Sequence, residues 1–180
     1  MSASSDGADA FVLPDINREE PLRAARLWRL VPDDRRLETA TRFWSDEDSA
    51  PIHGEALALL VKQLKFRPRS VMALPDEKKA RYLMSIRSLP EAVASRLLVV
   101  YHLAFQRQMM AAFLDALGIA NEDGVISEEL TPPGSAKAAA AARALKASHP
   151  QDDVRLYFLT LLYQDHESWE PLWGEVPTSD

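Results

Sequence analysis

The sequence has no cysteine among its 180 residues. This absence excludes disulfides, zinc–thiolate centres, iron–sulfur clusters and thiol catalysis. It has only six glycines, all isolated, so there is no glycine-rich loop to hold a phosphate. No apolar run is long enough to cross a bilayer, and the first ten residues lack the basic start and apolar core of a secretory signal. We therefore expect a cytoplasmic protein with no membrane segment.

Strand patterns are also nearly absent. Only residues 11–13 and 125–126 combine β-branched or aromatic side chains outside a helical context. Elsewhere, apolar residues recur at helical spacing, and the length suits one domain of ordinary size. The sequence therefore predicts a single all-α domain of about seven or eight helices over residues 11–180. A disordered N-terminal tail is expected over residues 1–10, which carry little apolar content.

The most apolar segment runs from Ser88 to Leu117 and contains no glycine and a single proline, near its start. Ser88 and Glu91 have the spacing of a capping box, and Gly118 is placed to end a helix in the left-handed conformation. Apolar residues occupy almost every face of this segment. The pattern predicts one long helix near residues 89–117, buried at the centre of a helical bundle.

Two later segments also have helical patterns. Residues 154–163 are apolar almost all round, which predicts a second deeply buried helix. Residues 136–147 are rich in alanine, and Leu145 is their only bulky apolar side chain. Their high helix propensity predicts a helix with a narrow, smooth face. Such a face suits close approach to another helix, so a homo-oligomer is one possible state.

The connection from Ile119 to Leu130 partly resembles an EF-hand calcium loop. Asn121, Asp123 and Gly124 fall at its third, fifth and sixth positions, but Ile119 and Leu130 stand where the first and last carboxylate ligands belong. Because Asp-Gly is a common turn signal, an ordinary turn packed on the core is the favoured interpretation. The sequence does not decide whether this loop binds a cation, and we predict no metal and no cofactor.

The four histidines carry no metal-binding spacing, because none has a second histidine three or four residues away. His102 differs from the others in lying among apolar residues of the predicted long helix. A buried imidazole needs a hydrogen-bond partner or stands neutral. A core histidine is the favoured interpretation. The alternative is a ligand pocket formed by Tyr101, His102 and Tyr157. Paired carboxylates begin helices, so we assign no catalytic residue.

Positive charge is concentrated in one part of the chain. Residues 62–107 contain ten basic and three acidic side chains, whereas the whole chain has a formal net charge of −6. A Pro in the turn at residues 67–69 limits the backbone entropy lost when two guanidinium groups bind a partner. The candidate partner-binding residues are Lys62, Lys65, Arg67, Arg69, Lys78, Lys79 and Arg81.

This basic segment has two interpretations. Acidic helices of the same chain can neutralise it, or its cations can remain exposed and bind an anionic partner. Phe66 is expected in the core, which leaves few exposed aromatics for stacking on bases, so nucleic acid is disfavoured relative to an acidic protein surface.

We therefore expect a non-enzymatic interaction protein: an adaptor, assembly factor or regulatory subunit. The alternative is a helical-bundle enzyme or small-ligand-binding protein with a pocket near His102. A polar-lined cavity touching His102 would favour this alternative, and a filled core with a basic face would favour the interaction protein.

Overall fold

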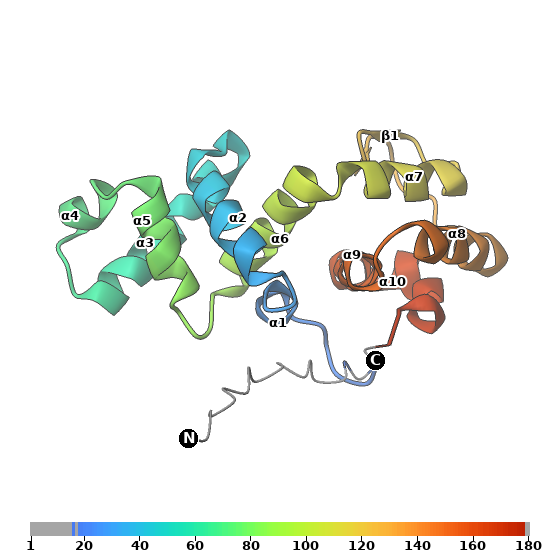
Figure 1. Cartoon of the computed structure of the whole chain (residues 1–180), viewed down its shortest axis with the longest axis horizontal. Coiled ribbons are helices and arrows are strands. Elements are labelled where there is room, and N and C mark those ends of the chain that lie inside the picture. Colours follow the sequence, from blue (N-terminus) through green and yellow to red (C-terminus); the bar gives the residue numbers. More distant parts are fainter. Residues whose placement is uncertain (1–15, 17, 179–180) are drawn as a thin grey trace, which may run out of the picture.

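The computed structural model describes residues 16 and 18–178, and it is built almost entirely of helices (Figure 1). The expected disordered tail over residues 1–10 lies outside the described residues. The α-helices are α1 (Ala24–Trp28), α2 (Asp33–Ser45), α3 (Ala50–Leu64), α4 (Pro68–Met72), α5 (Asp76–Met84), α6 (Glu91–Phe105), α7 (Arg107–Leu117), α8 (Ser135–Ser148), α9 (Gln151–Gln164) and α10 (His166–Trp169). Two 3-10 helices, η1 (Glu47–Ser49) and η2 (Glu170–Glu175), and two strands, β1 (Asn121–Glu122) and β2 (Val125–Ile126), complete the described part.

The prediction of an all-α fold is confirmed. The described part of the chain has ten α-helices rather than seven or eight, because the predicted long helix is divided into α6 and α7 and the connection after α3 contains the short helix α4. The only sheet in this part is the antiparallel pair β1–β2. Helix α9 is buried from Val154 to Leu162, as its apolar pattern predicted.

The predicted single long helix is wrong, because the chain bends by 89° between α6 and α7. Neither proline nor glycine lies at the break. Gln106 leaves the helical conformation there, with φ −122° and ψ 6°. Its N–H donates to the carbonyl of His102, and its carbonyl accepts from the N–H of Met110. One buried residue therefore ends α6 and begins α7, while its side-chain amide donates to the Tyr101 hydroxyl at 3.1 Å.

The bend separates two groups of buried side chains. The first is formed mainly by α1 to α6 and includes Leu97, Leu98 and Tyr101. The second is formed by α7 to α10 and η2 and includes Phe113 and Phe158. Helix α9 contributes to both groups, and in Figure 1 it lies on the inner side of the bend. The apolar residues of 89–117 are thus buried against two sets of helices rather than one, and α7 keeps an exposed face at Gln108, Ala112 and Asp115.

The capping box predicted at Ser88 is also absent. Helix α6 has Pro90 at its N-cap and no side-chain cap. The carboxylate of Glu91 instead accepts a hydrogen bond of 2.6 Å from the backbone N–H of Ala24. This N–H is the first of α1 and would otherwise lack an intrahelical partner. Glu91 therefore caps a neighbouring helix, which fixes α1 against α6.

The alanine face of α8 packs within the chain. Ala138, Ala141, Ala142 and Leu145 are buried in the second core, where α8 contacts α7, α9 and η2. Lys146 forms an ion pair of 2.6 Å with Glu175 of η2. The smooth face that suggested contact between copies is thus covered by elements of the same molecule.

No single helix in the described part is long and apolar enough to cross a membrane. Helices α6 and α7 pass the same test of length and composition only when taken together, across their 89° bend.

The hairpin connecting β1 to β2 packs directly on α7 at Gly124. Asp123 and Gly124 have positive φ angles of 49° and 84°, as a two-residue type I′ turn requires. A Cβ atom on Gly124 would lie 2.6 Å from Cβ of Met110 and 2.9 Å from the carbonyl oxygen of Arg107. Glycine is therefore required here both for its backbone conformation and for the close approach of the hairpin to α7.

We predict that Gly124→Ala lowers the free energy of unfolding by about 2 kcal/mol or more, because the methyl group meets backbone atoms that cannot move independently. Gly54→Ala is the matched control, since nothing lies within 4 Å of the added Cβ. This control should stabilise α3 by roughly 1 kcal/mol. Urea unfolding of the two variants measures both effects, and equal stabilities would contradict the close packing.

Candidate functional sites

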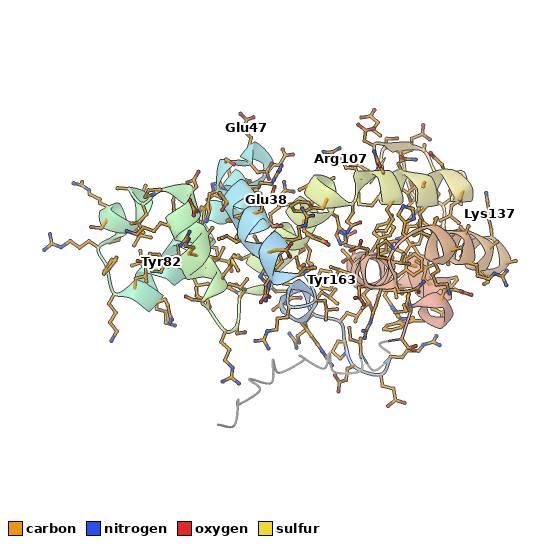
Figure 2. The ribbon with its side chains drawn as sticks, in the orientation of Figure 1. Glu38, Glu47, Tyr82, Arg107, Lys137 and Tyr163 are labelled. Carbon is orange, nitrogen blue, oxygen red and sulfur yellow. The ribbon has the colours of Figure 1, made fainter. Side chains whose placement is uncertain are left out.

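Five of the seven predicted partner-binding residues form an exposed basic surface at one end of the molecule. We call Lys62, Lys65, Arg67, Arg69 and Lys78 the basic tip. All five are exposed, and none of their side chains forms an ion pair or hydrogen bond within residues 16 and 18–178. They come from α3, α4, α5 and the connection between α3 and α4, the end of the molecule where Figure 2 shows long nitrogen-tipped side chains extending outward.

The other two predicted residues, Lys79 and Arg81, are paired within the chain. Lys79 forms an ion pair of 2.8 Å with Asp76, and its side chain is only 13% exposed. Its ammonium nitrogen also lies 5.0 Å from the centre of the Trp44 ring. Arg81 pairs with Glu77 one helical turn away at 2.6 Å. Lys79 therefore stabilises α5 and its packing on α2. Arg81 is less available to a partner than the residues of the basic tip, because it is paired with Glu77.

Two apolar side chains are exposed within the same segment. Phe66 is 48% exposed and Met72 is 61% exposed. The expectation that Phe66 lies in the core is wrong. The sequence contained a signal for this, because the apolar stripe of α3, which packs on the core, consists of Leu57, Leu60, Val61 and Leu64, and Phe66 does not continue it.

The backbone that carries these side chains is well fixed. Lys65 ends α3 in the left-handed conformation with φ 55°. The carbonyl of Arg67 then accepts hydrogen bonds from Ser70 and Val71 at 2.9 and 3.2 Å, which closes the first turn of α4. Val71 is fully buried and holds α4 on the core. A partner that bound at this surface would order side chains but little backbone.

His102 is the centre of the second candidate site. Its side chain is buried at 4% exposure, and Nε2 lies 3.0 Å from the hydroxyl oxygen of Thr160 on α9. Nδ1 is also buried and has no hydrogen-bond partner among the residues that the structure describes. Burial lowers the pKa of His102 to about 3. The imidazole is therefore neutral at pH 7 and a poor proton acceptor, which disfavours a role as a general base.

His102 borders a cleft next to the junction of α6 and α7. This His102 cleft has a volume of about 520 Å³ and is formed by α6, α7, α9 and the β1–β2 hairpin. His102 and Tyr157 line it, as the predicted pocket required, and burial raises the pKa of the Tyr157 hydroxyl. Tyr101 is not among the lining residues, because its hydroxyl accepts from Gln106 and its ring packs in the first core.

The charged residues at the cleft have structural partners. The Arg96 guanidinium donates to Asp46 at 2.7 Å and to the Ser49 hydroxyl at 2.8 Å, and this joins α6 to η1. Burial raises the pKa of Asp46, but the hydrogen bonds from Ser49 and Arg96 outweigh that effect and lower it. Nε of Arg107 donates to the carbonyl of Leu103 at 2.8 Å, while the residue itself remains exposed above the bend (Figure 2).

The partial calcium-loop pattern forms the hairpin. The Asn121 side chain accepts from the N–H of Gly124 at 3.0 Å and donates to Asp115 at 2.9 Å, so both ends of its amide are used locally. Val125, expected against the core, is 45% exposed. Among residues 16 and 18–178 there is no group of three or more His, Asp or Glu side chains arranged to hold a metal ion.

Comparisons with protein-family models, curated proteins and solved structures find no match to this chain.

The depressed pKa of His102 predicts a loss of stability in mild acid. The unfolded state takes up a proton near pH 6.5, whereas the folded state takes it up only near pH 3. The neutral His102 therefore makes its full contribution to the free energy of unfolding above pH 6.5, and this contribution falls as the pH is lowered toward 3. Lowering the pH from 7 to 5 should reduce the free energy of unfolding by about 2 kcal/mol through His102 alone. Unfolding by urea at both pH values should show this loss in the unaltered protein and a smaller loss in His102→Asn, which cannot titrate. Equal losses would show that His102 is not buried as a neutral imidazole.

Proposed function

We propose that this protein is a non-enzymatic interaction protein, an adaptor, assembly factor or regulatory subunit of the cytoplasm, that binds the acidic surface of a partner protein through the basic tip. The observation that carries the proposal is that Lys62, Lys65, Arg67, Arg69 and Lys78 stay exposed and unpaired within the described residues, in a chain that is acidic overall. Solvated charges of one sign raise the rate of encounter with an oppositely charged surface and orient it.

The exposed apolar residues support a protein partner. Charged contacts at an interface rim contribute little affinity, whereas buried aromatic and methionine side chains are typical of interface centres. Phe66 lies between Lys65 and Arg67, and Met72 ends the helix that carries Arg69. The cations of the basic tip would orient a partner, and the neighbouring Phe66 and Met72 would contribute the apolar contacts that give affinity. One exposed aromatic offers little of the repeated stacking that single-stranded nucleic acid requires.

We predict that Arg67→Glu with Arg69→Glu lowers partner binding at least tenfold without changing the thermal midpoint of unfolding. Lys137→Glu with Arg143→Glu on α8 is the matched control, because it makes the same change in net charge at two other exposed positions. The measurement is affinity purification of each tagged protein from its native host after nuclease treatment, followed by titration of the recovered partner. Equal recovery with both double variants, recovery lost on nuclease treatment, or no partner for the unaltered protein would overturn the proposal.

We also predict that Phe66→Ser weakens binding of the same purified partner about tenfold, because an apolar anchor of the interface is removed. The salt dependence of binding should stay unchanged, since no charge is altered, whereas Arg67→Glu should reduce it. Titration at two salt concentrations separates the two effects. Val125→Ser provides a matched control at an equally exposed apolar residue far along the chain. A Phe66→Ser affinity equal to that of Val125→Ser would show that Phe66 lies outside the interface.

A further inference from the structure

A cavity lined by arginines lies between α1, α2 and the connection from α5 to α6. Arg29, Arg36 and Arg87 line this cavity of about 410 Å³, which we call the arginine pocket. Arg29 directly follows α1, Arg36 lies on α2, and Arg87 lies in the connection that leads to α6. Asp33 is the only acidic residue among the described residues that line the pocket. Three positive charges therefore meet one negative charge, in a chain with a formal net charge of −6.

The charged groups of two of these arginines are fixed at the wall of the pocket. Nη2 of Arg29 donates to the backbone carbonyl of Arg87. Nη2 of Arg36 forms an ion pair with Asp33, whose side chain is 85% exposed. Since Arg87 and Asp33 are themselves lining residues, both guanidinium groups lie beside the pocket. Each keeps further N–H groups for a ligand, because a guanidinium has five.

The pocket holds more positive charge than its own residues neutralise. Burial, and in addition the charge of Arg29, lower the pKa of the Arg36 guanidinium, so the two cations lie close enough to repel each other. Arg87 is exposed, and its side chain forms no ion pair or hydrogen bond within residues 16 and 18–178. With Asp33 as the only lining carboxylate, two positive charges remain uncompensated. An anion bound among the three guanidinium groups would relieve this repulsion.

The positive surface continues on the other side of Arg29. A second cavity of about 370 Å³ shares Ala25 and Arg29 with the arginine pocket and is also lined by Arg23 and Arg26. Arg26 pairs with Glu20 at 2.7 Å. Arg23 is exposed, and its side chain has no ion pair or hydrogen bond in the part of the chain that the structure describes. An anion in the arginine pocket is therefore also attracted by a charge beyond its own wall.

The remaining walls of the arginine pocket suit an organic group. They are formed mainly by the apolar residues Ala25, Trp28, Met84, Ile86 and Leu89. A volume of about 410 Å³ lies within the range of small-molecule sites. The pocket therefore has space for an apolar group next to an anion.

We propose that the arginine pocket binds a small organic phosphate monoester. Arg29, Arg36 and Arg87 hold the phosphate, and the organic group lies against the apolar wall. A phosphate monoester carries nearly two negative charges at pH 7, which matches the two uncompensated positive charges, whereas a carboxylate carries only one. The planar fork of arginine also pairs well with phosphate oxygens. The site is independent of the basic tip, because no residue of the basic tip lines the pocket.

The test compares two probes of nearly equal shape. Phenyl phosphate has two negative charges at about pH 8, whereas phenyl sulfate has one. We expect the full chain to bind phenyl phosphate at least tenfold more tightly than phenyl sulfate in calorimetric titrations. Inorganic phosphate should bind more weakly than phenyl phosphate, because it leaves the apolar wall uncovered. In NMR spectra, phenyl phosphate should shift the backbone amide resonances of Arg29 and of residues 85–88 and leave those of the basic tip unchanged.

One variant and a matched control localise the binding. Arg87→Gln removes one guanidinium and should weaken phenyl phosphate binding about tenfold. Its fold should be retained, because the Arg87 side chain is exposed and has no partner among the described residues. Arg67→Gln removes one exposed positive charge from the basic tip and should leave this affinity unchanged.

Four results would overturn the proposal. They are equal affinity for phenyl phosphate and phenyl sulfate, inorganic phosphate binding as tightly as phenyl phosphate, no saturable binding of phenyl phosphate at millimolar concentration, and equal weakening by Arg87→Gln and Arg67→Gln. The comparison of probes in the unaltered protein remains decisive if Arg87→Gln does not fold. None of these results depends on the partner of the basic tip, so the two proposals can fail separately.

Discussion

The need to bury the many apolar side chains of residues 89–117 governs this structure. If these residues formed one straight helix, neighbouring helices would have to cover its apolar side chains along the whole length. The break at Gln106 removes this requirement, because α6 is buried in a core of α1 to α5 while α7 is buried against α8 and the C-terminal helices. Helix α9 reaches both cores, so it joins the two halves. The His102 cleft is lined by residues of α6, α7, α9 and the β1–β2 hairpin, so residues of both halves contribute to it.

The two candidate sites have opposite physical character. The basic tip is exposed and charged, on short helices held by few buried residues such as Val71. Its interactions are strongest at low ionic strength and act over several ångströms. The His102 cleft is mainly apolar, and its distinguishing group is a single neutral acceptor.

Helical periodicity was sufficient to predict the all-α fold and the burial of α9, because local apolar spacing determines which face of a helix is covered. It did not locate the break at Gln106, because no proline or glycine lies there. The three consecutive polar residues Gln106, Arg107 and Gln108 interrupt the apolar run at this point, and a polar triplet is also compatible with an uninterrupted helix. The roles of Glu91 and Lys79 were missed for a related reason. Glu91 caps α1, and Lys79 lies over the ring of Trp44 on α2. Both contacts join residues far apart in the chain, and sequence patterns do not show such long-range partners.

The candidate sites were predictable in part. Charge clustering located the basic tip, but pairing within the chain removed Lys79 from it. His102 was expected in the core and is there, whereas its partner Thr160 is 58 residues away and could not be assigned. The exposure of Phe66 could have been predicted, because Phe66 does not continue the apolar spacing of α3.

The hydrogen bond from Ala24 to Glu91 has a consequence for the order in which the protein folds. Helix α1 has only five residues, too few to be stable alone in water. Its capping group is 67 residues further along the chain, on α6. Closing so long a loop is entropically unfavourable and slow compared with forming a local turn. We therefore expect helix α1 to acquire its structure late, after α6 has formed and provided a carboxylate at which α1 can begin.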